Sequence, residues 1–256
     1  MAPRFPDLEG KHVLITGGSN GIGAALAVAF AGQGCRVTLL DKDVAAGERV
    51  LNACRARSGS GASLYPVDLT DTRALCDALA CIRRELPAID VLIANAGYDP
   101  RFELLDMSER QWNDLFQLNV THYFVTCREV LPAMIERGRG NIILTASHTV
   151  WLGKPDLIAY NSTKAATVGL MRSLAEAVGK DGIRVNAVAP GWTMTERQID
   201  QWVTDEAKRR TINELQTMPI EITPETLTGT YLFLASDCSR PIARQVLVAD
   251  AGQSKH

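Results

Sequence analysis

The chain has 256 residues, of which 46% are hydrophobic and 22% charged, and its formal net charge at pH 7 is −2. This composition is typical of a globular protein with a large core, and it gives no reason to expect a nucleic acid or a membrane as partner. No apolar run approaches the roughly 20 residues of a membrane span, and the amino-terminal residues lack the apolar stretch of a signal peptide. None of the six cysteines forms a C-x-x-C pair, so we expect a cytoplasmic protein with reduced thiols and no metal site.

The chain begins with a predicted strand, glycine turn and helix. The apolar run 12–16 leads into Gly-Gly-Ser-Asn-Gly-Ile-Gly at 17–23, and the helix-forming segment 24–30 follows. Glycine allows the tight turn, and the unpaired N–H groups at the start of the next helix attract a phosphate. A unit of this kind predicts a site for the pyrophosphate of a dinucleotide.

Asp41 directly follows the second predicted strand, 35–40. It lies 18 residues after Gly23 (41 − 23 = 18), near the roughly 20-residue spacing of an acid that binds the adenosine ribose. A carboxylate accepts a hydrogen bond from the ribose 2′-hydroxyl and repels a 2′-phosphate, so Asp41 favours NAD over NADP. The cation of Lys42 beside it can weaken this preference, and an ordinary turn aspartate is the alternative interpretation.

The rest of the chain alternates apolar strands with helices. Strands that are apolar throughout and alternate with helices imply a parallel sheet covered on both faces. We therefore predict an α/β fold, a single doubly wound Rossmann domain over residues 1–256 with about seven parallel strands. Further strands are predicted at 62–67, 90–94, 141–146, 183–189 and 245–249, helices at about 71–86, 108–136, 160–179, 196–216 and 224–236, and a flexible surface loop at 55–62.

An acid/base set lies in the middle of the chain. Tyr160 and Lys164 are four residues apart and share one face of a predicted helix, so the lysine charge is placed to lower the pKa of the phenol towards neutral. Ser147 directly follows the strand 141–146 and is expected to point into the crevice where such sheets bind ligands. Alone the Tyr-x-x-x-Lys pair is weak, because most such pairs are an exposed tyrosine beside a solvated lysine. The order of the other motifs gives it weight.

In this order the motifs resemble those of the short-chain dehydrogenase/reductase family, from about residue 8 to residue 252. The resemblance implies hydride transfer between a nicotinamide cofactor and a secondary alcohol or carbonyl carbon, in a homotetramer or homodimer. The matching motifs are Thr16-Gly-Gly-Ser-Asn-Gly-Ile-Gly23, Asp68, Asn95-Ala-Gly97, Asn119, Ser147, Tyr160-Asn-Ser-Thr-Lys164 and Pro190-Gly191.

The resemblance also implies roles for individual residues. Tyr160 would give or take the proton, Ser147 would orient the substrate oxygen, and Lys164 would bind the nicotinamide ribose and lower the tyrosine pKa. Asn119 would open its helix locally and hold a water in a proton relay. Non-catalytic relatives typically lose the tyrosine or the lysine, and this chain keeps both. The cofactor, expected to be NAD, would contact Gly17, Ser19, Asn20, Gly21, Ile22, Gly23, Asp41, Asp68, Leu69, Asn95, Gly97, Tyr160, Lys164, Pro190, Gly191, Thr193 and Thr195.

Within the family, the loops at 95–101, 151–160 and 195–198 look like those of bacterial sugar dehydrogenases that act on aldoses or keto-deoxy sugar acids. A polyol needs several hydrogen-bond partners. An arginine can hold the carboxylate of a sugar acid; the alternative is that Arg101 and Arg197 are solvated or form structural ion pairs. The candidate substrate residues are Asp99, Arg101, His148, Trp151, Trp192, Arg197 and Gln198.

The segment near 192–216 is expected to be a lid over the substrate. Trp192 and Trp202 in this segment support an alternative interpretation, in which an apolar lid covers an aliphatic or cyclic ketone. The chain departs from the family pattern where Ala243-Arg244 replaces the common Thr-Gly before the last strand, and where Ala251-Gly252 replaces the frequent Gly-Gly after Asp250. Either change can alter the subunit interface and the wall of the substrate site.

Overall fold

The computed structural model describes residues 3–58 and 61–255, and its strands form the predicted parallel sheet. In this described part of the chain the sheet has seven strands in the order β3-β2-β1-β4-β5-β6-β7, and every neighbouring pair is parallel. The fold prediction is confirmed. The strands are β1 (His12–Thr16), β2 (Arg36–Asp41), β3 (Ala62–Pro66), β4 (Val91–Ala94), β5 (Gly140–Thr145), β6 (Ile183–Pro190) and β7 (Val246–Ala249).

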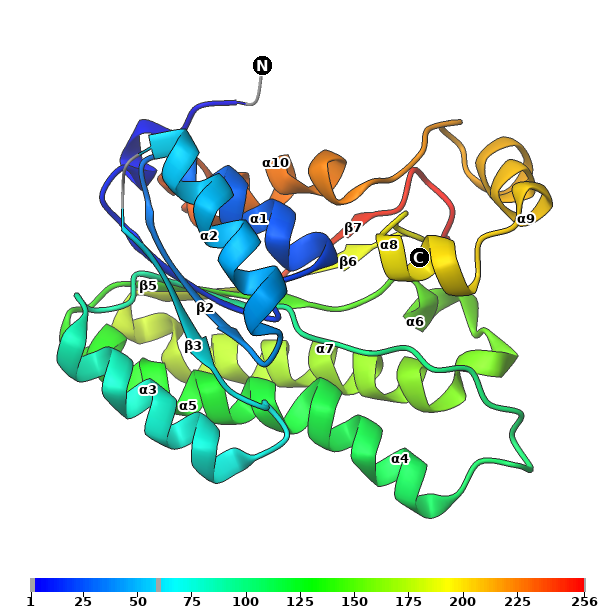
Figure 1. Cartoon of the computed structure of the whole chain (residues 1–256), viewed down its shortest axis with the longest axis horizontal. Helices are drawn as coiled ribbons and strands as arrows, with labels where there is room; N and C mark the ends of the chain where they lie inside the picture. Colours follow the sequence, from blue (N-terminus) through cyan, green and yellow to red (C-terminus); the bar gives the residue numbers. More distant parts are fainter. Residues whose placement is uncertain (1–2, 59–60, 256) are drawn as a thin grey trace.

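Helices cover both faces of the sheet, because successive side chains of a strand point to opposite sides. In β1, Val13 and Ile15 pack into one core cluster and Leu14 into the other. Burial on both sides explains why the strands are apolar throughout. Among the described residues, no helix combines the length and apolarity needed to cross a membrane. One layer holds α1 (Gly21–Ala31), α2 (Val44–Ser58) and α10 (Pro224–Ala235), and the other holds α3 (Thr72–Glu85), α5 (His122–Glu136) and α7 (Ile158–Val178) (Figure 1).

The strand order reverses at β1, and this reversal positions the site. The chain moves outward from β1 to β2 and β3, then returns to place β4 on the other side of β1. The connections on the two sides therefore lie on opposite faces, which leaves a crevice beyond the carboxyl ends of β1 and β4. Short elements border or follow the strands: α6 (Thr149–Leu152) and the 3₁₀ turns Pro155–Leu157 and Gly179–Asp181.

The predicted surface loop at 55–62 is wrong in its first half. Residues 55–58 form the last turn of α2, a helix that the sequence did not predict, and residues 59–60 lie outside the described residues. The helix buries only a narrow apolar stripe that includes Val50, Leu51 and Cys54. Exposed Glu48, Arg49 and Arg55 dilute the apolar signal that identifies a helix in the sequence.

The single helix predicted at 196–216 is broken into shorter pieces. Two helices, α8 (Glu196–Gln201) and α9 (Asp205–Arg210), precede a π-helical turn at Thr211–Leu215. Thr195 and Thr204 each accept a hydrogen bond from the main-chain N–H three residues later. Such caps start helices, so the second threonine restarts the helix after a bend at Trp202.

The helix predicted at 108–136 opens where the family resemblance placed an opening. Its first part is α4 (Glu109–Phe116), which is followed by a π-helical turn at Gln117–Thr121 and then by α5. Asn119 lies in the widened turn and is fully buried. Turns of this kind are rare and concentrate at functional sites, so the interruption marks this helix as part of the candidate site.

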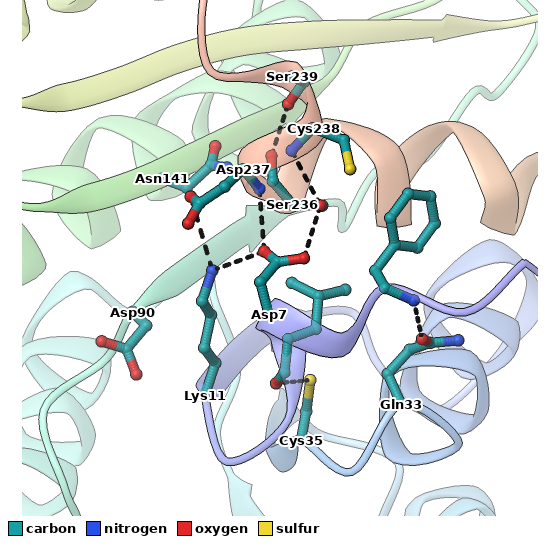
Figure 2. A network of polar contacts seen from close by, with 12 residues as sticks. Asp7, Lys11, Gln33, Cys35, Asp90, Asn141, Ser236, Asp237, Cys238 and Ser239 are labelled. Atoms are coloured by element: carbon teal, nitrogen blue, oxygen red, sulfur yellow. Dashed lines mark hydrogen bonds and ion pairs between the residues drawn. The ribbon is translucent and has the colours of Figure 1, made fainter.

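Figure 2 shows a polar cluster that joins the amino-terminal residues to the end of α10. Asp7, in the 3₁₀ turn Pro6–Leu8, accepts hydrogen bonds from Ser236 Oγ at 2.8 Å, from the main-chain N of Asp237 at 2.9 Å and from Lys11 Nζ at 3.2 Å. Burial acts to raise the pKa of Asp7, but these donors outweigh it and hold the pKa below its ordinary value. The 3₁₀ turn Asp237–Ser239 is thereby fixed against the start of the chain.

We expect Asp7→Asn to destabilise the protein at pH 7 by about 1–2 kcal/mol, because the donors then face an uncharged amide. The apparent melting temperature should fall by about 2–8 °C. A carboxylate with a lowered folded-state pKa stabilises the fold above its unfolded pKa of about 3.9, and this contribution disappears as pH falls through the folded-state value. Calorimetry at pH 7 and below pH 4 checks both effects; Asp106→Asn, at an exposed aspartate, is the matched control. Equal melting temperatures at pH 7 would contradict the role of Asp7.

Candidate active site

A crevice of about 1040 Å³ lies at the carboxyl ends of β1, β4, β5 and β6. The catalytic candidates Ser147, Tyr160 and Lys164 line it, whereas Asn119 does not and is instead hydrogen-bonded to the lining residue Tyr98. Of the glycine turn, Gly17, Asn20, Gly21 and Ile22 line the crevice, whereas Gly18, Ser19 and Gly23 do not. The predicted cofactor residues that line the crevice are Gly17, Asn20, Gly21, Ile22, Asp41, Asp68, Leu69, Asn95, Gly97, Tyr160, Lys164, Pro190, Gly191, Thr193 and Thr195.

The glycine turn is shaped to receive a pyrophosphate. Gly17 has a φ of 66°, and a Cβ on Gly23 would overlap the carbonyl oxygen of Gly17. Asn20 precedes α1 but its side chain does not cap the helix; its amide nitrogen donates to Asp43 at 3.2 Å instead. The N–H groups in the first turn of α1 are therefore left for a ligand, and the positive end of the helix dipole favours an anion there. The residues present fit a dinucleotide.

Asp41 is held in place by main-chain groups at the edge of this turn. Its two carboxylate oxygens accept hydrogen bonds from the N–H groups of Ser19 and Asp43, both at 3.0 Å. Lys42 pairs with Asp68 at 3.3 Å, and the hydrogen bonds from Thr70 hold the pKa of Asp68 below its ordinary value. The charge of Lys42 is thus balanced by a neighbouring acid, which limits its ability to attract a 2′-phosphate.

Lys164 is buried in the wall of the crevice. Its Nζ donates to the main-chain oxygen of Thr145 at 2.8 Å and to the Tyr123 hydroxyl at 3.4 Å. It also lies 5.6 Å from the centre of the Tyr160 ring. Burial lowers the pKa of Lys164 to about 7, although the charge of Asp99 acts in the opposite direction. A Cβ on Gly97 would come within 3.2 Å of this Nζ, so any larger residue there would crowd the lysine.

The pKa of Tyr160 moves in the opposite direction to the one predicted. Burial raises it above the ordinary value for a phenol, and the charge of Asp99 raises it further, while Ser147 and the charge of Arg197 lower it. The sequence argument considered only the charge of Lys164. In the folded chain the loss of water around the phenol is the larger effect, because it disfavours the phenolate.

Asn119 fixes the loop that follows β4. Its side chain accepts from the main-chain N of Tyr98 at 2.9 Å and donates to the main-chain O of Tyr98 at 2.9 Å and to Thr163 Oγ1 at 3.1 Å. These bonds tie the widened turn to that loop and to α7. Ser147 is held separately, by a 2.9 Å hydrogen bond with Thr149 Oγ1. Both residues are therefore fixed before any ligand binds.

The predicted substrate residues around Asp99 form one connected network. Asp99 accepts hydrogen bonds from Arg197 and from Gln198, the latter at 2.8 Å, and the Gln198 side-chain oxygen accepts from Trp192 Nε1 at 2.9 Å. The Arg197 guanidinium also lies 5.0 Å from the centre of the Tyr98 ring. The network joins the loop after β4 to α8 across the crevice.

Arg101 and Arg197 both form internal ion pairs, which was the predicted alternative to binding a substrate carboxylate. Arg101 pairs with Asp156 at 3.3 Å, and its guanidinium lies 4.2 Å from the centre of the Trp202 ring. Trp151 is a correction, because it does not line the crevice and packs against the hydrophobic core instead. Its apolar surface is better buried there than beside polar loops.

His148 lines the crevice with a defined tautomer. Its Nδ1 lies 2.8 Å from the main-chain oxygen of Pro190, which can only accept, so we assign the proton to Nδ1 and the lone pair to Nε2. Burial lowers the pKa of His148, which favours this neutral form at pH 7. The ring therefore supplies an acceptor for a hydroxyl group.

Several residues that line the crevice were not predicted from the sequence. Tyr98, Asp156 and Gln253 are part of the crevice wall, and none belongs to a motif with a recognisable spacing. Asp156 had one signal, since it lies in a loop with resemblance to sugar dehydrogenases. Gln253 had none, because its place depends on how the chain turns after β7.

Comparisons with known proteins agree with this geometry. The family model described as short chain dehydrogenase matches residues 11–206. At 37% identity over 249 residues, 97% of each chain, the protein is similar to the probable galactose dehydrogenase GalD of Rhizobium meliloti. It is also 36% identical over 236 residues, 91% of each chain, to D-xylose 1-dehydrogenase of Caulobacter vibrioides.

A solved structure extends the likeness to three dimensions. L-sorbose reductase from Gluconobacter frateurii, in complex with NADPH and L-sorbose, aligns with a TM-score of 0.91 and 26% identity over 98% of this chain and 99% of that one. The strand order, the crevice with its polar lining and the matched family model all agree. The chain therefore belongs to the short-chain dehydrogenase family and is an oxidoreductase that acts on alcohol or carbonyl groups with a nicotinamide cofactor.

Proposed function

We propose that this protein is an NAD-dependent dehydrogenase of a sugar, polyol or sugar acid, with neutral sugars as its main substrates. The observation that carries the proposal is the polar wall around Tyr160, where Asp99, His148 and Gln198 line the crevice. A polyol needs donors and acceptors on several sides, and such a wall supplies them. The relatives named for galactose and xylose support the same class.

Charge pairing favours a neutral sugar over a sugar acid. Both candidate carboxylate ligands already have partners, because Arg197 pairs with Asp99 and Arg101 with Asp156. A substrate carboxylate would have to displace an acid that the fold supplies, and it would also approach the negative charge of Asp99. A neutral hydroxyl can instead join these pairs as an additional hydrogen-bond partner.

An apolar ketone is the weaker candidate. Its support was a lid formed by Trp192 and Trp202, but the Trp192 indole N–H is bonded to Gln198 and the Trp202 ring lies against the Arg101 guanidinium. A purely apolar substrate would leave the polar groups of this wall without partners, which is unfavourable. The segment 192–216 is then a polar lid whose α8 is fastened by Asp99.

The chain's own residues account for the proton transfer. Bound with its pyrophosphate at the glycine turn, the nicotinamide cofactor would accept or supply the hydride. Tyr160 takes the proton from the substrate hydroxyl in oxidation and returns it in reduction, while the Ser147 hydroxyl donates a hydrogen bond to the same oxygen. Lys164 lies close enough to stabilise the phenolate, because burial that disfavours each charge alone strengthens the attraction between them. Asn119 holds the loop that carries Tyr98.

Asp41 supports NAD as the cofactor. Its carboxylate, fixed by two main-chain N–H groups, offers an acceptor to the ribose hydroxyls and repels a 2′-phosphate. The similar L-sorbose reductase was solved with NADPH, so the fold alone does not exclude a cofactor with a 2′-phosphate. In this proposal the side chain of Asp41, at the end of β2, decides between NAD and NADP.

Substrate class is tested by following NADH formation at pH 8 with purified protein. We expect turnover of neutral aldoses or polyols with NAD, and at least about tenfold lower kcat/KM for sugar acids of the same chain length. The free energy of desolvating a carboxylate that finds no free cationic partner exceeds the free energy that corresponds to a tenfold ratio. Turnover of apolar secondary alcohols alone would contradict the proposed class. It would leave the family assignment intact.

Tyr160→Phe should reduce kcat by about 100-fold or more, because removing a general acid/base costs about 10²–10⁴-fold. The variant keeps the ring that lies beside Lys164, so we expect unchanged binding of NADH, measured by its fluorescence. Ser162→Ala, a hydroxyl on the same helix that bonds to Ile158 O, is the control. Full activity in Tyr160→Phe would refute its role.

Asp41→Ala should narrow the preference for NAD over NADP. Loss of a charged hydrogen bond to the ribose and of the repulsion towards a 2′-phosphate should reduce the ratio of the two kcat/KM values by about tenfold or more. Asp77→Ala, at an exposed acid on α3, should leave the ratio unchanged. An unaltered ratio in Asp41→Ala would mean that this carboxylate does not contact the ribose.

A further inference from the structure

We propose that Gln253, in the turn after β7, is a specificity-determining residue whose carboxamide binds a hydroxyl of the substrate. The inference rests on the proposed function, because only a polyhydroxylated substrate has a hydroxyl to spare beyond the one that reacts. Gln253 lines the same crevice as Ser147, Tyr160 and Trp192. It belongs to none of the motifs that the sequence analysis identified.

The side-chain oxygen of Gln253 has no hydrogen-bond partner among the described residues, although it is buried. Buried amide oxygens are nearly always paired, because an unpaired one has lost its water without compensation. The last torsion of a glutamine is broad, so rotation about it can turn the amide towards the crevice. A substrate hydroxyl, which both donates and accepts, matches either end.

The turn that carries Gln253 is fixed on both sides. Asp250 is 4% exposed, and its carboxylate accepts hydrogen bonds from the main-chain N of Gly252 at 2.9 Å and from the N and Oγ of Ser254 at 2.7 and 2.6 Å. These bonds close a loop around Gln253. A side chain on such a turn is positioned before the substrate arrives, which is what selective recognition requires.

The same turn is fastened to the end of the lid segment. The main-chain oxygen of Ala251 accepts from the N–H groups of Thr217 at 2.9 Å and Met218 at 3.0 Å, and Thr217 Oγ1 donates to Gly252 O at 3.0 Å. In Figure 1 the red segment after β7 lies at the same end of the molecule as α8 and α9. Gln253 therefore enters the crevice between the strand ends and the lid.

Ala251 adopts a backbone conformation that the surrounding structure imposes. Its φ is 56°, in the left-handed region that residues with a Cβ rarely occupy. Such strain persists where neighbouring contacts over-determine it, and it concentrates at ligand sites. Here the contacts are those of Asp250 and Thr217, and they direct the next side chains of the turn. The Ala251-Gly252 departure from the family pattern thus shapes the turn that carries Gln253.

His148 adds a second acceptor to this side of the crevice. Asp250 lies near His148, because its charge acts against the burial that lowers the pKa of that histidine. The ends of β6 and β7 meet here, since a Cβ on Gly191 would lie 2.8 Å from the Cα of Asp250. Nε2 of the assigned tautomer accepts, whereas the Gln253 amide can donate or accept. A hydroxyl bound by Gln253 can therefore be recognised together with its neighbour on the sugar.

The test compares wild type with Gln253→Leu on a sugar that wild type oxidises and on its mono-deoxy analogues. Leu keeps much of the volume and removes the hydrogen bonds. We expect KM for the parent sugar to rise about 3- to 10-fold with little change in kcat, since one uncharged hydrogen bond is lost. One deoxy analogue should be oxidised equally well by both proteins, because the group that Gln253 binds is already absent from it.

Controls separate this assignment from folding and from the proposed function. Gln245→Leu changes an exposed glutamine just before β7 and should behave as wild type. Gln253→Glu keeps an acceptor and should bind the neutral parent sugar better than Gln253→Leu does. The assignment of Gln253 alone is overturned if Gln253→Leu has the same KM for the parent sugar as wild type, and if removing any one hydroxyl from the sugar changes the kinetics of both proteins equally. Absence of any sugar turnover by wild type overturns the proposed function and this inference together.

Discussion

Thr16, Asn95 and Thr145, at the ends of three parallel strands, form a hydrogen-bonded polar seam. This seam connects the cofactor turn to the proton-transfer residues. Asn95 donates from its main-chain N to Thr16 Oγ1 at 3.0 Å and from its side chain to Gly17 O at 3.3 Å, which braces the glycine turn against β4. Thr145, at the end of β5, reaches Asn95 through its hydroxyl and holds Lys164 through its carbonyl oxygen. Parallel strands bring these groups together because their carboxyl ends lie at one edge of the sheet.

The seam also explains why the acid/base residues are buried and yet usable. The Tyr123 hydroxyl donates a hydrogen bond to the main-chain oxygen of Thr145, and the Tyr231 hydroxyl is hydrogen-bonded to the Thr145 side chain. The surroundings of Lys164 are therefore formed by hydrogen-bonding groups of the protein. Desolvation then raises the pKa of Tyr160 and lowers that of Lys164. A charge on either residue is therefore sensitive to its immediate neighbours, and this sensitivity suits a site that transfers a proton during each reaction.

At the other end of the crevice, recognition depends on groups that the fold has already paired. Asp99 holds Arg197 and Gln198, and Asp156 holds Arg101. Buried or half-buried charges of this kind are stable only with their partners, so the wall presents dipoles and partially satisfied acceptors to the substrate. The same principle applies to Asp250, which uses its charge to shape the turn around Gln253 rather than to bind a ligand.

The amino-acid sequence was sufficient to predict the parallel α/β sheet, the glycine turn, and the grouping of Asp41, Ser147, Tyr160 and Lys164 at one crevice, because apolar strands and fixed residue spacings are local signals. It missed α2, whose apolar stripe is narrow, and the bend at Trp202, where a threonine restarts the lid helix. The folded structure was needed to show that Arg101 and Arg197 form ion pairs, that Trp151 packs against the hydrophobic core and that Gln253 lines the crevice. Each of these outcomes depends on burial and on contacts between loops far apart in the chain, and neither quantity can be obtained from residue spacing.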